Sequence, residues 1–311
     1  MKFQNALEAS DLDVLRRCPK SDLHNHAILG GNREFILGRT GRDIAPLNRK
    51  LRSIAEMHAW VDENAGGIFN SREGRLLGFE AALLQAKDDG VTRLEIGEDV
   101  WASTLFDNSA EQLTRELARL HALVAPEIDW IPQVGLSRHC SLHALQRWLE
   151  PFLALDLYQT LDLSGDEFAR PIERFKPLYR MAKARGLRLR AHVGEWGSAD
   201  DMWRAAEELE LDEIQHGIAA VESPVVMRFL ADNRIRLNLC PTSNVMLGRV
   251  ERIESHPIRR LYDAGIRVTI NTDDALLFGR TVSQEFLTLY RAGLFNAAEL
   301  DQIRLDALMD N

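Results

Sequence analysis

Short apolar segments recur along this chain, and most are followed by a longer segment whose apolar residues have helical spacing. This alternation is the pattern of repeated strand–helix units, which build a parallel sheet covered by helices. Eight short segments can be counted, and eight parallel strands close into a barrel. The expected fold is therefore α/β, a (β/α)8 TIM barrel. The expected strands are residues 21–26, 93–97, 128–136, 158–163, 187–193, 213–217, 236–240 and 267–272.

The segments between these strands carry the helical pattern, and several end in glycine. Gly90, Gly186 and Gly265 each follow such a segment and precede a strand, where a residue that tolerates left-handed backbone suits a helix end. No proline-rich, serine-rich or low-complexity linker interrupts the pattern, so residues 1–311 are expected to form one domain. The expected helices are residues 72–88, 109–124, 143–155, 171–185, 199–209, 223–233 and 256–264.

The first connection, residues 27–71, is too long for a simple loop between a strand and a helix. It contains apolar residues such as Met57 and Trp60, enough to form short helices over the strand ends. Long loops in compact domains are often lids over a site. We therefore expect a long lid-like insertion after the first strand. Ordinary surface helices with a local core are the alternative.

Charge and cysteine content narrow the function class. Lys+Arg number 38 and Asp+Glu 47, a net charge of −9, which disfavours nucleic acid and an anionic membrane surface as partners. No run of about 18 apolar residues predicts a membrane span, and residues 1–19 lack the features of a signal peptide. The three cysteines form neither a disulfide framework nor a CxxC pair. We expect a cytoplasmic protein, and leave open whether it forms a homo-oligomer.

Histidines and acids stand where the expected strands end, and in this kind of barrel functional groups lie at the carboxyl ends of the strands. The two histidines of residues 21–26 are two positions apart, so an extended segment aims both at one face. Adjacent aspartates that end a buried strand need a metal, a partner or a proton. Three imidazoles and one carboxylate suffice to bind a divalent cation such as zinc and leave a position for water. The residues concerned are His24, His26, His192, Glu195, His216, Asp273 and Asp274.

Each of these features has an ordinary explanation when taken alone. A His-x-His pair is often incidental, a single histidine such as His216 is often a hydrogen-bonded barrel residue, and adjacent aspartates often cap a helix. All of them, however, fall on one rim of the expected barrel. Their coincidence there favours an active site.

Read in chain order, these residues resemble the adenosine and AMP deaminase family of the amidohydrolase superfamily, nearly from end to end. Three further stretches carry the resemblance, and together the motifs are specific for the family although each alone is weak. The stretches are residues 161–167 (LDLSGDE), residues 240–244 (CPTSN), and residues 256–265 (HPIRRLYDAG) leading to the NTDD at 271–274.

The resemblance implies one metal ion. His24, His26, His192 and Asp273 would bind one zinc, with another divalent metal as the alternative. Related barrels with two metals bridge them with a modified lysine or an acid at the end of the fourth strand, and residues 160–165 contain no lysine. Zinc would supply the nucleophile, because it lowers the pKa of a bound water to about 7.

The resemblance also implies the acid–base residues. Glu195 would protonate the purine ring nitrogen, which suits a carboxylic acid close to the metal that does not ligate it. His216 would orient or deprotonate the attacking water. Asp274 would hold that water and hydrogen-bond the purine.

Substrate recognition is the point where the chain departs from the family. By resemblance, His26 and Asp274 would contact the substrate, and Gly165 would offer its backbone amide to a ring nitrogen, with Asp162 supporting that turn. In adenosine deaminases the residue two after the second histidine is typically an acid that helps hold the ribose, but here Ile28 occupies that place. The sugar end of the site is therefore expected to differ.

The expected function is zinc-dependent hydrolytic deamination of a 6-aminopurine nucleoside, adenosine or a close analogue, to the 6-oxo product and ammonia. The alternative is a single-metal amidohydrolase that acts on free adenine, a modified nucleoside or another cyclic amide or amidine. A third interpretation, a binding protein on an inactive deaminase scaffold, predicts loss of a metal or acid–base residue, and none is missing. The expected partner is a small purine substrate, without nucleic acid or membrane.

Overall fold

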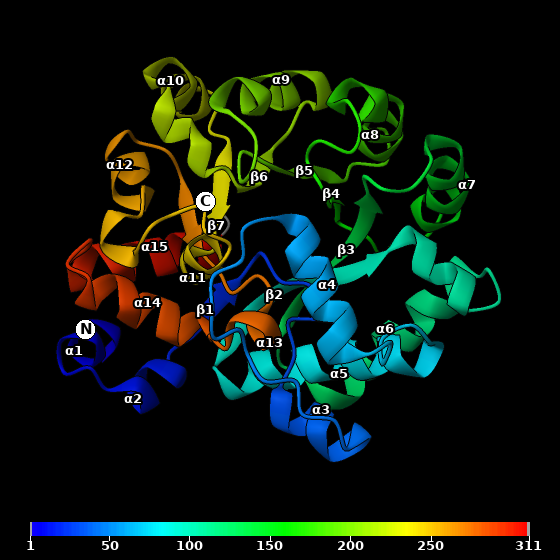
Figure 1. The fold of residues 1–311 in the computed structure, drawn as a ribbon, viewed down its shortest axis with the longest axis horizontal. Helices are drawn as coiled ribbons and strands as arrows, with labels where there is room; N and C mark the ends of the chain where they lie inside the picture. The colour runs from blue at the N-terminus through cyan, green and yellow to red at the C-terminus, as the bar shows by residue number, and fades with distance from the viewer. Residues whose placement is uncertain (1, 310–311) are drawn as a thin grey trace.

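Eight parallel strands form one sheet in sequence order in a computed structural model that describes residues 2–309. Neighbouring strands from β1 to β8 all pair in parallel, and Figure 1 shows them at the centre of a ring of helices. The (β/α)8 barrel predicted from the alternation of segments is confirmed. The strands are β1 (Lys20–Asp22), β2 (Val91–Asp99), β3 (Asp129–Ser137), β4 (Thr160–Ser164), β5 (Arg188–Val193), β6 (Glu213–His216), β7 (Arg236–Leu239) and β8 (Val268–Ile270).

All seven predicted helices are present around the sheet, with ends that differ by a few residues. The segment predicted as 171–185 begins as a 3-10 turn, Ile172–Phe175, and continues as α8, which has a proline in its first turn. Gly90 and Gly186 take positive φ angles of 69° and 78°, as expected for residues that end helices. These helices are α5 (Arg72–Asp88), α6 (Ala110–Val124), α7 (Leu142–Leu153), α8 (Lys176–Lys183), α9 (Ala199–Leu209), α10 (Pro224–Asp232) and α12 (Ile258–Asp263).

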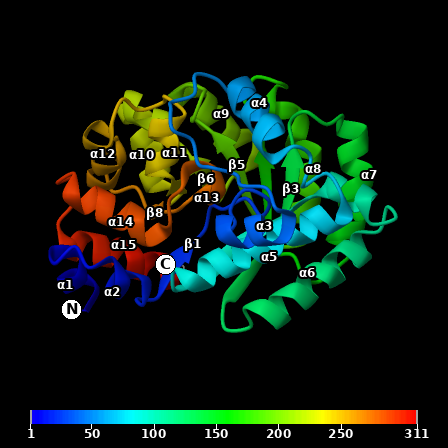
Figure 2. The same ribbon diagram turned by 60° about the horizontal axis from the view of Figure 1, so that its bottom comes forward.

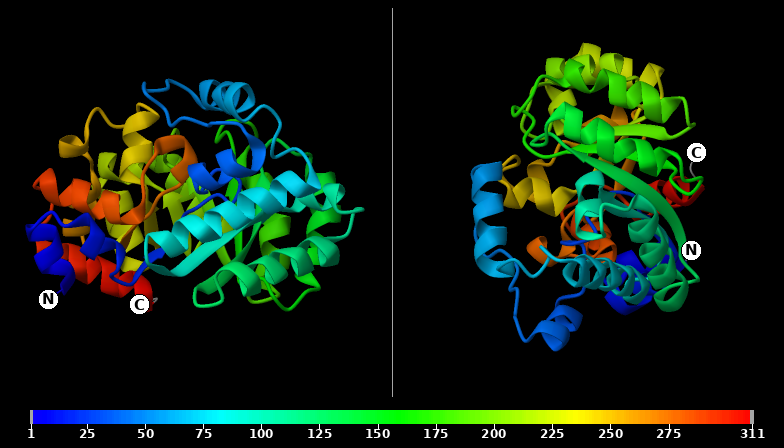
Figure 3. Two further views of the ribbon diagram at one scale, coloured as in Figure 1. Left: turned by 90° about the horizontal axis from the view of Figure 1, so that it is seen from below. Right: turned by 90° about the vertical axis from the view of Figure 1, so that its right-hand side faces the viewer.

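Helices at the two ends of the chain, which the sequence analysis did not predict, complete the outer layer. The N-terminal α1 packs on the C-terminal α15, and Figure 3 shows them side by side. α15 also packs against β1 and β8. Within residues 2–309, no helix is both long and apolar enough to cross a bilayer. These end helices are α1 (Lys2–Glu8), α2 (Leu12–Arg16), α14 (Val282–Arg291) and α15 (Ala297–Met309).

Side chains join β1 to β8 beyond the ends of the strand ladders. The carboxylate of Asp22 accepts hydrogen bonds from the hydroxyl of Thr272 at 2.5 Å and from its backbone N–H at 3.2 Å. The backbone N–H of Leu23 donates to Asn271 Oδ1 at 2.8 Å. The predicted first and last strands ran to residues 26 and 272, but the observed strands end at Asp22 and Ile270, and an isolated bridge pairs Asn25 with Asp273 beyond them. These polar contacts lie directly before the histidines and aspartates that were predicted from the sequence.

A layer of paired charges fills part of the barrel interior, where apolar branched residues are usual. The Arg190 guanidinium is fully buried, and its Nη1 lies 2.5 Å from Glu95 Oε2 and 3.4 Å from Glu213 Oε2. Its Nη2 donates to Gln133 Oε1 at 3.2 Å, and Nη1 also donates to the Leu23 carbonyl at 3.1 Å. Since loss of one partner would leave a buried unpaired charge, the network holds the segment before the first histidine in place.

The insertion of residues 27–71 forms α3 (Arg33–Thr40) and α4 (Ile54–Ala65). α3 packs on α5, as Figure 2 shows, and the insertion has a small apolar cluster of its own. α4 lies over the end of the barrel where the strands finish (Figure 1), and Met57 and Val61 line a cavity there. The insertion thus borders the cavity, and its movement as a lid stays a prediction.

Candidate active site

A cavity of about 480 Å³ lies at the carboxyl ends of the strands. His24 lies beneath the other predicted residues with 1% of its surface exposed and contacts them. Eight residues predicted from the sequence therefore meet at one place. The seven that line the cavity are His26, Gly165, His192, Glu195, His216, Asp273 and Asp274.

Four donor atoms from three strand ends converge beside this cavity. His192 Nε2 lies 3.1 Å from His24 Nε2 and 3.3 Å from His26 Nε2. Asp273 Oδ1 lies 3.5 Å from His24 Nε2 and 3.2 Å from His26 Nε2. A tetrahedral zinc with Zn–N distances of about 2.0–2.1 Å spaces its ligand atoms by about 3.3–3.4 Å. These four separations are close to the spacing around a single metal ion of this size.

Contacts on the outer side of these candidate ligands orient them. His24 Nδ1 lies 3.1 Å from the carbonyl oxygen of Asn238, so a proton on Nδ1 leaves the Nε2 lone pair facing the other donors. The hydroxyl of Ser243 donates to Asp273 Oδ2 at 2.6 Å, which leaves Oδ1 toward the histidines. Such outer partners fix the tautomer and the direction of metal ligands.

Asp162 and Gly165 lie near each other in sequence but have separate surroundings. The Asp162 carboxylate lies 3.1 Å from His192 Nδ1, and its expected support of the Gly165 turn stays a prediction. Asp162 lies in the middle of β4 and is buried. Gly165 follows β4 with φ of 93°, and a Cβ there would lie 3.0 Å from the His139 ring. Glycine thus allows the positive φ angle and leaves room for the His139 ring.

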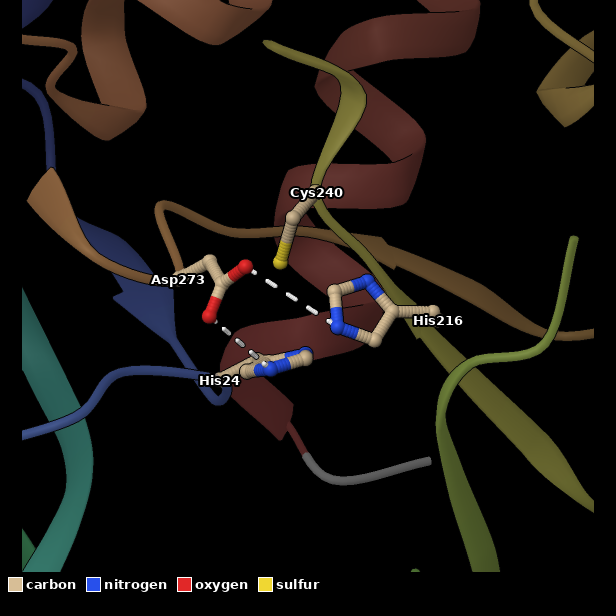
Figure 4. Close-up of side chains that lie close together, drawn as sticks. All are labelled: His24, His216, Cys240 and Asp273. Atoms are coloured by element: carbon tan, nitrogen blue, oxygen red, sulfur yellow. Dashed lines mark ion pairs between the residues drawn. The ribbon is translucent and has the colours of Figure 1, made fainter. Parts of the chain in front are cut away.

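Two residues of the cluster have unusual backbone conformations. His216 and Asp273 have φ of 62° and 61°, a region that costs non-glycine residues roughly 1–2 kcal/mol and that often marks functional sites. Figure 4 shows both side chains turned toward His24, with Cys240 beside them. Burial raises the thiol pKa of Cys240 well above its usual range. The sequence analysis assigned no role to Cys240, although it begins the CPTSN stretch directly after β7.

Two carboxyl groups at the cavity have raised pKa values. Burial, followed by the negative charges of Asp273 and Glu167, raises the pKa of Glu195 well above its usual range. Its Oε1 lies 3.6 Å from His216 Nε2 and has no hydrogen-bond partner among residues 2–309. Burial and the neighbouring Asp273 raise the pKa of Asp274 to about 8. A carboxylic acid that stays protonated at neutral pH inside a cavity can act as a general acid.

The loop that carries Glu195 is held by the carboxylate of Glu167. The backbone N–H groups of Gly194, Glu195 and Trp196 donate to it at 2.8, 2.9 and 2.7 Å. Arg249 Nε donates to the Glu195 carbonyl at 2.9 Å from the other side. Glu167 stands in the LDLSGDE stretch, but sequence alone does not indicate which loop a carboxylate caps.

Glu167→Gln is expected to lower turnover and to shift its pH dependence. The amide cannot accept as many backbone N–H bonds, and bonds to charged groups contribute about 1.5–3 kcal/mol each. Loss of the charge also removes one cause of the raised Glu195 pKa. Because a general acid acts only while protonated, the loss of kcat on the alkaline side should move to lower pH. Profiles of kcat against pH test this, with the exposed Glu207→Gln on α9 as the control; an unshifted profile would contradict it.

Histidines and an aspartate that converge at the strand ends of a barrel are typical of amidohydrolase-type enzymes. A sequence model of the family described as adenosine deaminase matches residues 145–310. A Treponema pallidum protein named "Putative adenosine/adenine deaminase" is 33% identical over 91% of this chain and 95% of its own length. An adenine deaminase of Albidiferax ferrireducens is 31% identical over 90% of this chain and 85% of its own.

Solved structures agree on the fold. The crystal structure of an adenine deaminase from Arthrobacter aurescens superposes with a TM-score of 0.82 and 24% identity, covering 94% of this chain and 93% of that one. The chain belongs to the adenosine deaminase family, and it is an adenosine deaminase-like hydrolase. The family acts on small purine substrates and typically depends on a single metal ion, for which this chain has a candidate cluster.

Proposed function

We propose that this chain hydrolyses the 6-amino group of a purine, adenosine or a close analogue, to the 6-oxo product and ammonia. The observation that carries the proposal is the position of Glu195, a buried carboxyl group with a raised pKa, beside a four-atom donor set in one cavity. Deamination needs both parts, because water must add to the ring carbon while a proton is added to the adjacent ring nitrogen.

His24, His26, His192 and Asp273 would hold one zinc, and another divalent metal is possible. The spacing of their donor atoms supports this ligand set. When bound, zinc lowers the pKa of a water to about 7 and so supplies a nucleophile at neutral pH.

Glu195, His216 and Asp274 would carry out the proton chemistry. Glu195 would donate its proton to the ring nitrogen as aromaticity is lost, and its raised pKa supports this role. His216 Nε2 and Asp274 Oδ1 would contact the attacking water, and Asp274 has a buried oxygen free of protein partners in the described chain. His26 and Asp274 would contact the purine, and the backbone of Gly165, which lines the cavity, would bind a ring nitrogen.

A nucleoside is favoured by the polar wall of the cavity near Ile28. Arg75 Nη1 and Glu98 Oε2 form a buried ion pair at 3.0 Å, with Arg75 over the Trp101 ring at 4.4 Å. Both residues line the cavity, and Glu98 Oε1 has no partner within residues 2–309. Ile28 packs against Gly78, one helical turn after Arg75. A sugar hydroxyl donating to Glu98 would satisfy this oxygen in the region where the usual ribose-binding acid is missing.

Free adenine is the second candidate. It needs no sugar contact, which agrees with the replacement of the acid by Ile28. Two relatives that match nearly the full chain carry adenine in their names.

Ammonia release from a substrate panel separates these candidates. The panel contains adenosine, 2′-deoxyadenosine, 5′-modified adenosines, AMP and adenine. We expect adenosine-type nucleosides to give the highest kcat/KM. Glu98→Gln should raise KM for adenosine about 10-fold, as expected for loss of a hydrogen bond, and should leave KM unchanged for substrates that lack the sugar. A preference for adenine that Glu98→Gln leaves unchanged would favour the second candidate. If the metal-loaded protein released ammonia from no compound of the panel, both candidates would be overturned.

A further inference from the structure

A chain of hydrogen bonds leads from the start of α12 to His216. The backbone N–H of Ile258, the first residue of α12, donates to His256 Nδ1 at 3.1 Å. His256 Nε2 lies 3.1 Å from Asn244 Oδ1, and Asn244 Nδ2 lies 3.2 Å from His216 Nδ1. Asn244 belongs to α11 (Pro241–Met246) and is fully buried, and His256 is 3% exposed.

The first hydrogen bond of this relay fixes the donor and the acceptor of each later one. A backbone N–H can only donate, so His256 Nδ1 must accept, and a neutral imidazole then carries its proton on Nε2. That proton points to Asn244 Oδ1, which turns the amide nitrogen toward the other histidine. An amide nitrogen also only donates, so His216 Nδ1 accepts and its proton lies on Nε2. Burial keeps the His256 ring neutral by lowering its pKa to about 3.

We infer that Asn244 and His256 are positioning residues that hold His216 in the tautomer whose Nε2 carries the proton and faces the cavity. His216 Nε2 lies 3.6 Å from Glu195 Oε1 and 3.9 Å from Asp273 Oδ2. In this tautomer His216 donates a hydrogen bond to the attacking oxygen, and its Nε2 has no lone pair with which to take a proton from water. The sequence left open whether His216 orients or deprotonates the water. In this tautomer His216 orients it.

The tautomer itself is observable without turnover. In the zinc-loaded protein with ¹⁵N-labelled histidine, two-bond ¹H–¹⁵N correlation spectra distinguish protonated from unprotonated ring nitrogens, and His216→Gln identifies the His216 signals. We expect an unprotonated Nδ1 and a protonated Nε2. A proton on Nδ1, in either the other neutral tautomer or a charged ring, would overturn the inference.

Asn244→Asp is the matched variant, because it preserves shape but offers only acceptors to both histidines. His216 Nδ1 should become protonated, and kcat should fall roughly 100-fold, as for loss of one aligned donor, with little change in KM. His256→Gln keeps a donor for Asn244 and should retain the tautomer, whereas His256→Leu should give a mixture of both. Unchanged His216 signals in Asn244→Asp would refute the relay. The catalytic consequence rests on the proposed function, but the spectra do not, so the two can fail separately.

Discussion

Glu195→Gln is expected to bind zinc as the natural chain does and to lose turnover by roughly 100- to 10,000-fold, the usual contribution of general acid–base catalysis. Glutamine keeps the size of the side chain and the backbone contacts of the loop with Glu167 and Arg249. It cannot, however, give a proton to the ring nitrogen. Zinc content and kcat for the best substrate of the panel measure the two effects separately.

The control for this variant is Glu207→Gln, the same change at an exposed position of α9. It should leave both zinc content and kcat unchanged. Full activity of Glu195→Gln would remove Glu195 from the mechanism. Loss of zinc would instead indicate that Glu195 acts on the metal site.

His24→Ala is expected to lose metal affinity by more than about 100-fold, because changes in the outer partners of metal ligands alone cost 10- to 100-fold. His24 is buried at the centre of the cluster, within 3.5 Å of both His192 and Asp273. Its removal takes away one of the four donors and leaves a carboxylate and two imidazoles without their common partner. Metal content after dialysis measures the loss.

Zinc should also raise the unfolding temperature of the natural chain, because an ion that binds only the folded state stabilises it. This rise should be absent in His24→Ala. His143→Ala, at an exposed position of α7, is the matched histidine control and should behave as the natural chain. Equal zinc content in His24→Ala and the natural chain would show that His24 is not a ligand.

The sequence predicted the barrel because its strands are covered by helices and therefore stand out as short apolar runs. The ends of β1 and β8 were less predictable, since the Asp22–Thr272 contacts that replace the ladder there depend on strands far apart in sequence. The helices α14 and α15 were missed because they follow the last strand, where no further strand frames a helical segment. The buried position of Arg190 was equally hidden, because a charged residue in a strand pattern does not indicate which face it occupies.

The residues facing the cavity could be predicted because strand ends of a barrel converge on one rim. The contacts of the residues behind them could not be predicted. Asp162, Glu167, Asn244 and His256 all stand in motifs that the sequence analysis quoted, but their partners are on other strands or loops. Only the folded structure shows which residue or loop each one contacts.

The central claim is that one metal ion and the residues around it deaminate a purine. Its most direct test is a zinc titration of metal-depleted protein, in which ammonia release from adenosine and from adenine is followed as zinc is added. The account predicts no activity without metal and a linear rise that saturates at one zinc per chain. Full activity in metal-free protein, or a rise that continues to two zinc ions per chain, would contradict it.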